Sequence, residues 1–326
     1  MHILVLGGAG MVGRKFIERL ARDGHLGGKP VTRVTAQDVV VASPPPAAPF
    51  DFEAVVSDLS IHGESEKLIA TRPELIIHLA AVVSGEAEAD FDKGYRINLD
   101  GTRYLFEAIR HAEGYKPRVV FTSSVAVFGA PFHDKIEDEF FTTPLTSYGT
   151  QKAIGELLLC DYSRRGFFDG VGIRLPTICV RPGKPNKAAS GFFSNIIREP
   201  LNGEEAVLPV SDQVRHWHAS PRSAVGFLIH AATMDTAAIG PRRALTMPGY
   251  SCTVAEQIET LRKVAGENVV KRIRRETDPV IDGIVAGWPR NFDPQRALAL
   301  GFKAEANFEE IIRVHIEDEL HGTFVK

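Results

Sequence analysis

The chain opens with a short apolar run that is followed by three glycines, each three residues after the last. Residues 3–6 suit a strand that is buried on both faces, and apolar residues recur at helical spacing after the glycines. Gly7 permits a tight turn, Gly10 lets a ligand approach the backbone, and Gly13 allows a helix to pack closely on the strand. A helix that starts there offers free N–H groups and a positive dipole end to a pyrophosphate. The opening therefore predicts a dinucleotide-binding strand, turn and helix.

A carboxylate stands at the tip of the next predicted strand. Residues 31–36 form that strand, and Asp38 follows its end. A carboxylate in this position accepts hydrogen bonds from the hydroxyls of the adenosine ribose and repels a 2′-phosphate. Because no arginine directly follows Asp38, we expect NAD rather than NADP as the cofactor. The alternative is that Asp38 is a solvated carboxylate of a loop.

Strand and helix patterns alternate through the first half of the chain, which is typical of a parallel sheet covered by helices. Further strands are expected at residues 53–56, 75–79, 119–122 and 171–175, and helices at about 11–23, 64–71, 91–113 and 146–165. The predicted fold class is α/β, a doubly wound parallel-sheet Rossmann fold with a smaller C-terminal α+β substrate lobe. We assign residues 1–176 and about 214–236 to an NAD-binding Rossmann domain, and residues 177–213 and 237–326 to the substrate-binding lobe.

Polar and small residues follow the predicted strands, at the edge of the sheet where ligands of such folds bind. Asp58, which precedes Leu59, is placed to accept a hydrogen bond from an adenine amino group. Leu79 and Ala80 end the next strand, where the small residues of this stretch let the backbone run beside a dinucleotide. Asn98 lies in the following helix, and its amide either contacts the cofactor or bridges structural elements.

A tyrosine and a lysine stand four residues apart in the helix expected at residues 146–165. Positions i and i+4 share one face of a helix, so the phenol of Tyr148 and the ammonium of Lys152 can point into the same site. A neighbouring cation favours the phenolate and lowers a pKa that is otherwise about 10. Tyr148 is therefore a candidate general base. A hydroxyl of Ser123 or Ser124, at the end of the preceding strand, is a candidate donor to the reacting oxygen.

The composition excludes several classes of partner. The chain has 326 residues, 44% of them hydrophobic, a formal charge of −3 and no dense basic run, so we expect neither nucleic acid nor a membrane surface as a partner. No stretch reaches the roughly 18 apolar residues of a membrane span, and we recognise no signal peptide. The three cysteines, Cys160, Cys179 and Cys252, show no metal-binding spacing and suit a reducing compartment. We therefore expect a cytoplasmic enzyme without a metal.

Taken together, these motifs resemble the extended short-chain dehydrogenase/reductase family. The resemblance rests on an ordered set of residues: Gly7, Gly10, Gly13, Asp38, Asp58, residues 78–81, Asn98, Ser124, Tyr148 and Lys152. It implies a Rossmann domain, a bound nicotinamide cofactor and a Ser-Tyr-Lys catalytic group. In that group Tyr148 takes the hydroxyl proton, Lys152 holds the nicotinamide ribose, and Ser124 is the catalytic hydroxyl. The remaining cofactor neighbours that the resemblance implies are Met11, Val12, Leu59, Leu79, Ala80, Ser123, Pro176 and Ile178.

Departures from the family pattern narrow the chemistry. The dehydratases of the family carry Asp-Glu after the catalytic hydroxyl residue, where this chain has Val125 and Ala126. The nucleotide-sugar epimerases carry an asparagine where this chain has Thr177, and an aspartate that has no counterpart in residues 215–223. Dehydration and a large diphosphate-linked substrate are therefore not expected.

The features that remain favour a small anionic substrate. Arg215 retains the position of a family arginine that reaches the substrate, and a guanidinium binds a carboxylate through two parallel hydrogen bonds. Ser84 and Thr177 are candidate substrate contacts, and Arg181 with Thr177 flanks the expected nicotinamide edge. The alternatives are that Arg215 forms a surface or interdomain salt bridge, and that Ser84 and Thr177 are structural.

Within the family, the sequence is similar over nearly its full length to the D-erythronate dehydrogenases. The similarity includes residues 2–13, 147–152, 174–183 and 191–195. It implies NAD-dependent oxidation of the C2 hydroxyl of a four-carbon sugar acid to 2-oxo-tetronate. Two alternatives stay open, a nucleoside-diphosphate-sugar epimerase and a non-catalytic NAD-binding sensor. Homodimers through the helices at 91–113 and 146–165 are common in the family, and residues 311–320 are expected to form an amphipathic helix that serves packing.

Overall fold

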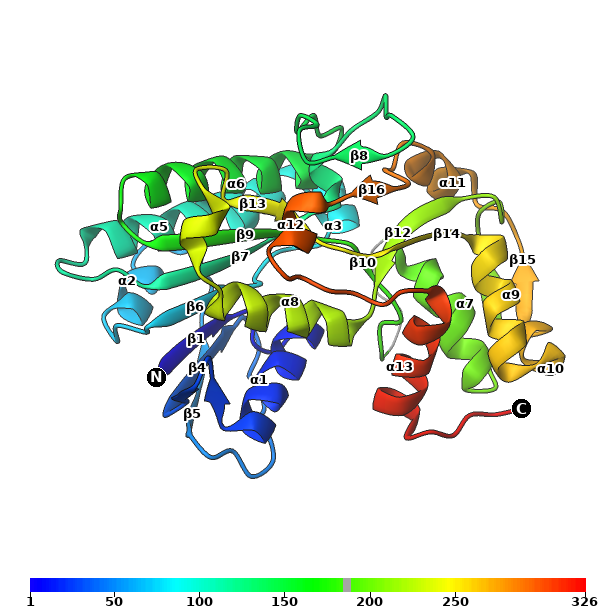
Figure 1. Cartoon of the computed structure of the whole chain (residues 1–326), viewed down its shortest axis with the longest axis horizontal. Helices are drawn as coiled ribbons and strands as arrows, with labels where there is room; N and C mark the ends of the chain where they lie inside the picture. The colour runs from blue at the N-terminus through cyan, green and yellow to red at the C-terminus, as the bar shows by residue number, and fades with distance from the viewer. Residues whose placement is uncertain (184–188) are drawn as a thin grey trace. The chain divides into compact units, whose positions relative to one another are not determined.

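The computed structural model describes residues 1–183 and 189–326, and the chain divides into two compact units (Figure 1). Unit 1 consists of Met1–Val127, Thr146–Leu175 and Val225–Thr246, and unit 2 consists of Phe128–Leu145, Pro176–Ala224 and Met247–Lys326. The units are interleaved along the chain more than the ranges expected from the sequence. The reason is strand pairing, because residues 215–219 pair within unit 2 and residues 244–246 pair within unit 1.

Unit 1 is built on a seven-stranded sheet in which every neighbouring pair is parallel. Its strands are β1 (His2–Leu6), β4 (Arg33–Asp38), β5 (Asp51–Val56), β6 (Leu75–His78), β7 (Arg118–Ser124), β9 (Asp169–Leu175) and β13 (Ala244–Thr246). The strand order is β13-β9-β7-β6-β1-β4-β5, so the chain reverses direction across the sheet between β1 and β6. This is the doubly wound α/β order that the sequence predicts, and ligands of such sheets bind at the point of reversal.

Helices cover both faces of the unit 1 sheet. Alternate residues of β1 point to opposite faces, as in any strand. Leu4 and Leu6 pack in a core with residues of α2 (Glu64–Ile69), α5 (Gly101–His111) and α6 (Ser147–Arg164). Helix α1 (Met11–Asp23) buries Phe16, Ile17 and Leu20 and lies on the other side of the sheet (Figure 1).

The predicted helix at residues 91–113 is divided into three consecutive segments. They are α4 (Phe91–Gly94), the π-helical segment η1 (Tyr95–Asp100) and α5, and α3 (Ser84–Ala89) precedes them. Thr146 caps α6 because its side-chain oxygen accepts a hydrogen bond from the Gly149 N–H at 3.1 Å. The cap sets the start of the helix one residue before Tyr148.

Unit 2 contains short strands and helices around its own apolar core. Its strands are β8 (Ile136–Glu137), β10 (Thr177–Ile178), β11 (Ala206–Leu208), β12 (Arg215–Ala219), β14 (Tyr250–Thr253), β15 (Ile273–Arg275) and β16 (Phe292–Asp293). Its helices are α7 (Gly191–Leu201), α9 (Val254–Ala265), α10 (Glu267–Val270), α11 (Pro279–Ala286), α12 (Gln295–Ala299) and α13 (Phe308–Leu320). Helix α13 buries Phe308, Ile311 and Ile312 in that core, so the predicted C-terminal amphipathic helix is confirmed as a packing element.

Four small elements complete the chain. They are the β2 (His25–Leu26) and β3 (Lys29–Pro30) ribbon and the 3-10 turns η2 (Val125–Val127) and η3 (Thr236–Ile239). Helix α8 (Pro221–Thr233) crosses the boundary between the two units. None of the helices in residues 1–183 and 189–326 is long and apolar enough to cross a membrane.

Candidate active site

The turn between β1 and α1 contains the three glycines that the sequence analysis identified, and two of these positions require glycine. A Cβ on Gly13 would lie 2.4 Å from the carbonyl oxygen of Gly7. At Gly7, φ is +84°, and a Cβ there would lie 2.8 Å from the backbone nitrogen of Ala80. Gly10 is exposed, and a Cβ there would be 3.3 Å from the Gly7 carbonyl oxygen. Close backbone packing therefore dictates Gly7 and Gly13, whereas Gly10 leaves the backbone open to a ligand.

The first turn of α1 has the electrostatics of an anion site. Gly10 is the N-cap residue and contributes no side-chain cap, and the turn that includes Met11 and Val12 holds no acidic residue. The N–H groups and dipole of this helix end are therefore not neutralised by a carboxylate of the same turn. With the open backbone at Gly10, the turn fits the pyrophosphate of a dinucleotide.

Asp38 is the last residue of β4, and its carboxylate is fixed above the glycine turn. One carboxylate oxygen accepts a hydrogen bond from the Ala9 N–H at 3.0 Å, and the other accepts from the Val39 N–H at 2.7 Å. A carboxylate has about four lone-pair sites, so these two bonds leave acceptor capacity for ribose hydroxyls. Asp38 is thus half-buried at the end of a strand, with a backbone N–H bound to each of its oxygens.

Asp58 and Leu59 follow β5, and the Asp58 carboxylate is engaged by protein groups. It accepts from the Ser60 backbone N–H at 2.9 Å and the Ser60 hydroxyl at 2.6 Å, and Arg96 donates to its other oxygen at 3.1 Å. Burial opposes ionisation, but the hydrogen bonds from Ser60 and Arg96 hold the pKa of Asp58 below its usual value. Leu59 is buried.

Asn98 links the segment after β6 to helix α6. Its side-chain oxygen accepts from the Val82 N–H at 2.8 Å, and its amide nitrogen donates to the side-chain oxygen of Gln151 at 2.7 Å. Leu79, at the start of that segment, donates its N–H to the Leu6 carbonyl at 2.8 Å. Asn98 thus has the bridging role that was one of its two interpretations. Gln151, which is fully buried beside Lys152, was missed from the sequence because it lies between the two motif residues without a polar pattern of its own.

Lys152 is buried next to the phenol ring of Tyr148. Its ammonium donates to the Thr122 carbonyl oxygen at 2.8 Å, and lies 5.0 Å from the centroid of the Phe121 ring and 5.8 Å from that of Tyr148. Burial lowers the pKa of Lys152 to about 8, although the negative charge of Glu156 acts in the opposite direction. The helix therefore brings the tyrosine and the lysine together, as their spacing predicts.

The two serines at the end of β7 point to different partners. The Ser124 oxygen accepts from the Ala126 N–H at 3.1 Å, which directs the acceptor side of the hydroxyl into the protein and leaves its proton to be donated elsewhere. Ser123 is buried, and its hydroxyl donates to Glu156 at 2.5 Å. Ser124 is the better placed of the two to act as a donor to a ligand.

A buried ion pair lies one helical turn beyond Lys152. The Arg174 guanidinium donates to the Glu156 carboxylate from Nε at 2.9 Å and from a terminal nitrogen at 2.7 Å, and the side chains are 12% and 6% exposed. Neither residue of this pair was predicted from the sequence. The four-residue step from Lys152 to Glu156 was its only local signal, because Arg174 comes from another strand.

Three of the predicted site residues lie at β10 of unit 2 or directly before it. Pro176 and Ile178 are buried, and Thr177 is half-buried between them, with its hydroxyl 2.8 Å from Nε2 of His216. The Arg181 guanidinium contacts the Ser190 hydroxyl at 2.5 Å and the Ile178 carbonyl at 3.2 Å. His216 was not recognised from the sequence.

Arg215, on β12 of unit 2, already has protein partners. One terminal nitrogen donates to Glu256 at 3.0 Å, and the other donates to the Ser251 carbonyl at 3.1 Å. The Arg215 and Glu256 side chains are 37% and 54% exposed, and an exposed pair of this kind contributes only about 0–1 kcal/mol. The surface salt bridge is therefore present, but it contributes so little that the carboxylate of a ligand can replace Glu256 as the partner of Arg215. Ser84, in unit 1, is half-buried at the start of α3.

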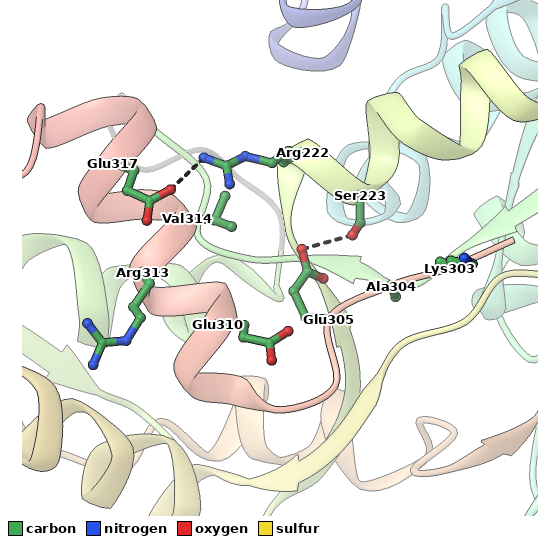
Figure 2. Close-up of a pocket in the computed structure, with 9 residues that line it drawn as sticks. All are labelled: Arg222, Ser223, Lys303, Ala304, Glu305, Glu310, Arg313, Val314 and Glu317. Carbon is green, nitrogen blue, oxygen red and sulfur yellow. Dashed lines mark hydrogen bonds and ion pairs between the residues drawn. The ribbon is translucent and has the colours of Figure 1, made fainter.

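Unit 2 also contains a concavity of about 380 Å³ that none of the predicted site residues lines (Figure 2). Its walls carry both signs. Arg222 pairs with Glu317 at 2.9 Å, and Glu305 accepts from the Ser223 hydroxyl at 2.8 Å. Because these charges are matched, the concavity lacks the excess of positive charge that an anionic substrate requires. Within residues 1–183 and 189–326, no three His, Cys, Asp or Glu side chains are grouped to hold a metal.

Comparison with known proteins places this geometry in a family. Residues 3–232 match the model of the NAD dependent epimerase/dehydratase family. The chain is 48% identical over 322 residues to the D-erythronate dehydrogenase of Cupriavidus necator, covering 98% of both chains. It is 41% identical to the D-erythronate dehydrogenase of Haemophilus influenzae, covering 98% of this chain and 100% of that one.

A solved structure also matches closely. It is described as the nucleoside-diphosphate-sugar epimerase from Agrobacterium tumefaciens and is 67% identical, with a TM-score of 0.97 over 99% of this chain and 95% of that one. The names of these three relatives therefore describe two different chemistries.

Proposed function

This chain belongs to the NAD-dependent epimerase/dehydratase family as an NAD-dependent oxidoreductase, and on that premise we propose that it oxidises a small sugar acid. Our specific proposal is oxidation of the C2 hydroxyl of D-erythronate to 2-oxo-tetronate, with Tyr148 as the general base. The observation that carries it is the buried Lys152 ammonium, 5.8 Å from the Tyr148 ring. The two relatives named D-erythronate dehydrogenase, each of which matches 98% of the chain, support the choice of substrate.

Bound NAD supplies the acceptor for the hydride that leaves C2. We propose that the backbone of Gly10, Met11, Val12 and Gly13 holds its pyrophosphate, because that turn is open and positively polarised. Asp38 accepts from the hydroxyls of the adenosine ribose. The further contacts that we propose for the cofactor are Gly7, Asp58, Leu59, Leu79, Ala80, Asn98, Ser123, Tyr148, Lys152, Pro176 and Ile178.

The proton of the C2 hydroxyl passes to the Tyr148 oxygen as the carbon–oxygen double bond forms. The Lys152 ammonium favours the phenolate that accepts this proton, because opposite charges attract strongly in a buried site. Ser124 donates its hydroxyl proton to the substrate oxygen, consistent with the acceptor role that its oxygen already has toward Ala126. Tyr148 is thus the proposed base, Lys152 the stabilising cation and Ser124 the hydrogen-bond donor.

We propose that Arg215, Ser84 and Thr177 recognise the substrate. The Arg215 guanidinium binds the carboxylate bidentately in exchange for its exposed partner Glu256. Holding the carboxylate and the hydroxyls orients C2, and orientation of this kind supplies several kcal/mol of the barrier reduction in enzymes.

A nucleotide-sugar epimerase remains the second candidate, because the 67% identical structure carries that description. Against it stand Thr177 and the stretch 215–223, which lack the asparagine and aspartate of the family's epimerases. The two functions differ in their cofactor balance. A dehydrogenase accumulates reduced nicotinamide in step with product, whereas an epimerase restores its cofactor in each turnover.

The deciding experiment follows reduced nicotinamide by its absorbance. Purified protein is given NAD or NADP with D-erythronate, its stereoisomers and the five- and six-carbon aldonates, and separately with nucleoside-diphosphate sugars. We expect stoichiometric NAD reduction with D-erythronate. Conversion of a nucleotide sugar without net reduction would instead establish the epimerase. NAD binding without turnover of any substrate would indicate a sensor.

A further inference from the structure

A hydrogen bond in unit 2 joins Thr177 to a histidine that the proposed chemistry does not use. The Thr177 hydroxyl oxygen on β10 lies 2.8 Å from Nε2 of His216 on β12. Either atom could in principle be the donor, since a hydroxyl both donates and accepts and a neutral imidazole carries one N–H. The direction of this bond decides what Thr177 can offer to a ligand.

The surroundings of His216 fix which of its ring nitrogens carries the proton. The ring is 3% exposed and stacks on Phe193 with the planes 8° apart, and Trp288 packs at 5.2 Å between centroids. Its Nδ1 lies 2.8 Å from the backbone carbonyl oxygen of Pro289. A carbonyl oxygen can only accept, so Nδ1 must carry a hydrogen.

The other ring nitrogen is therefore an acceptor. Burial lowers the pKa of His216 to about 4, with the Pro289 carbonyl acting in the opposite direction, so the ring is neutral near neutral pH. A neutral ring that is protonated at Nδ1 has a bare lone pair at Nε2. The Thr177 hydroxyl must donate its only proton to that lone pair, and the Thr177 oxygen then has lone pairs alone to present to a ligand.

We propose that His216 is a positioning residue that makes Thr177 a pure hydrogen-bond acceptor, so that Thr177 selects a hydroxyl donor of the substrate. This inference rests on the proposed function, in which Thr177 contacts the sugar acid. It names the chemistry that Thr177 takes, a C3 or C4 hydroxyl, and excludes a carboxylate or oxo group there, because both would bring lone pairs against lone pairs. The carboxylate must then go to a cation, which is the role proposed for Arg215.

The proton position can be tested without any turnover. We would label the protein with ¹⁵N-histidine and record long-range ring correlations near neutral pH. His216→Phe identifies the signal among the 11 histidines. We expect a neutral ring with hydrogen on Nδ1 and none on Nε2. A ring protonated at Nε2, or at both nitrogens, would overturn the inference whatever the enzyme's substrate.

The selectivity is tested with substrates that lack one hydroxyl. We would compare kcat/KM for D-erythronate with that for 2,4-dihydroxybutanoate and 2,3-dihydroxybutanoate, which lack the C3 and the C4 hydroxyl. An ordinary hydrogen bond corresponds to a preference of about five- to tenfold. We expect wild type and Thr177→Ser to show that preference against one of the two analogues. Thr177→Val, which has the same shape without the hydroxyl, should lose it. An undiminished preference in Thr177→Val contradicts the proposal.

The role of His216 is separated from simple packing by a matched pair of variants. His216→Phe keeps an aromatic ring but removes the acceptor, so the Thr177 hydroxyl is released and the preference should fall, mainly through KM. His218→Phe is the control, since His218 is also fully buried on β12 but its Nε2 contacts Gln257 rather than Thr177. Equal loss of preference in both variants would show a packing effect and overturn the assignment. If wild type oxidises no sugar acid, the proposed function fails, and the ring spectrum still decides the proton position.

Discussion

Replacing Lys152 by methionine separates catalysis from stability. The proposed role of the buried ammonium is to favour ionisation of Tyr148, whereas burial of its charge lowers the free energy of unfolding. If the 5.8 Å between the Lys152 ammonium and the centroid of the Tyr148 ring is taken as the separation of the two charges, the Coulomb energy of an ammonium and a phenolate is about 3 kcal/mol with an effective dielectric constant of about 20. That energy corresponds to a factor of about 10² in the fraction of Tyr148 that is ionised. We therefore expect Lys152→Met to lower kcat/KM near neutral pH by about 10²-fold, and to move the acid limb of the pH profile to higher pH.

The same substitution should not weaken the fold. Because burial lowers the pKa of Lys152 to about 8 from 10.5, the folded protein binds this proton less tightly than the unfolded chain does. Stability from this group therefore rises between those two pH values, and below pH 8 the charged lysine costs about 3 kcal/mol. Methionine removes that cost but leaves the Thr122 carbonyl without its hydrogen-bond donor, which lowers the free energy of unfolding by about 1 kcal/mol. We expect a net gain of about 2 kcal/mol in the free energy of unfolding.

The assays are steady-state kinetics across pH and urea unfolding near neutral pH, with the exposed Lys67→Met as the control. Retention of wild-type kcat/KM at neutral pH by Lys152→Met would refute the electrostatic role of the ammonium. A marked loss of stability would refute the argument that its burial is costly.

Three further substitutions test the rest of the site. Tyr148→Phe should lower kcat by at least about 10²-fold while NAD affinity, measured by calorimetry, stays nearly unchanged; native turnover would mean that another group is the base. Asp38→Asn keeps an oxygen to accept from Ala9 but removes the charge, so the kcat/KM ratio of NAD to NADP should fall by at least about tenfold, and an unchanged ratio would exclude Asp38 from cofactor choice. Gly13→Ala places a Cβ 2.4 Å from a backbone oxygen, and it should abolish NAD binding or lower the melting temperature. The control is Gly226→Ala in helix α8, where nothing lies within 4 Å of the added Cβ, and this variant should be neutral or stabilising. Equal effects of the two variants would show that the turn is not sterically restricted.

The features that depend on residues close together in the sequence were predicted from local patterns. The apolar run and glycines at the start of the sequence predicted β1, its turn and α1, because strand burial and glycine geometry are decided within about a dozen residues. The four-residue step from Tyr148 to Lys152 likewise predicted a shared helix face, and the ammonium lies beside the ring. The parallel order of the sheet followed from the alternation of strands and helices.

Contacts between distant segments were not predictable in this way. Asn98 forms a hydrogen bond with Gln151, 53 positions away in the sequence, and Arg174 forms one with Glu156, 18 positions away. No periodicity in the sequence predicts either pair. Such pairs form only once a sheet has brought its strand ends and helices together, and burial then makes each polar group find a partner.

The histidine at position 216 shows the limit most clearly. The sequence determined only that a threonine stands where the family's nucleotide-sugar epimerases carry an asparagine, and it gave no sign of a role for His216. Only the tertiary structure decided that Nδ1 of that histidine faces a carbonyl 73 residues away. That single acceptor sets the tautomer, and the tautomer sets whether Thr177 donates or accepts, because a ring nitrogen and a hydroxyl take their roles from what surrounds them.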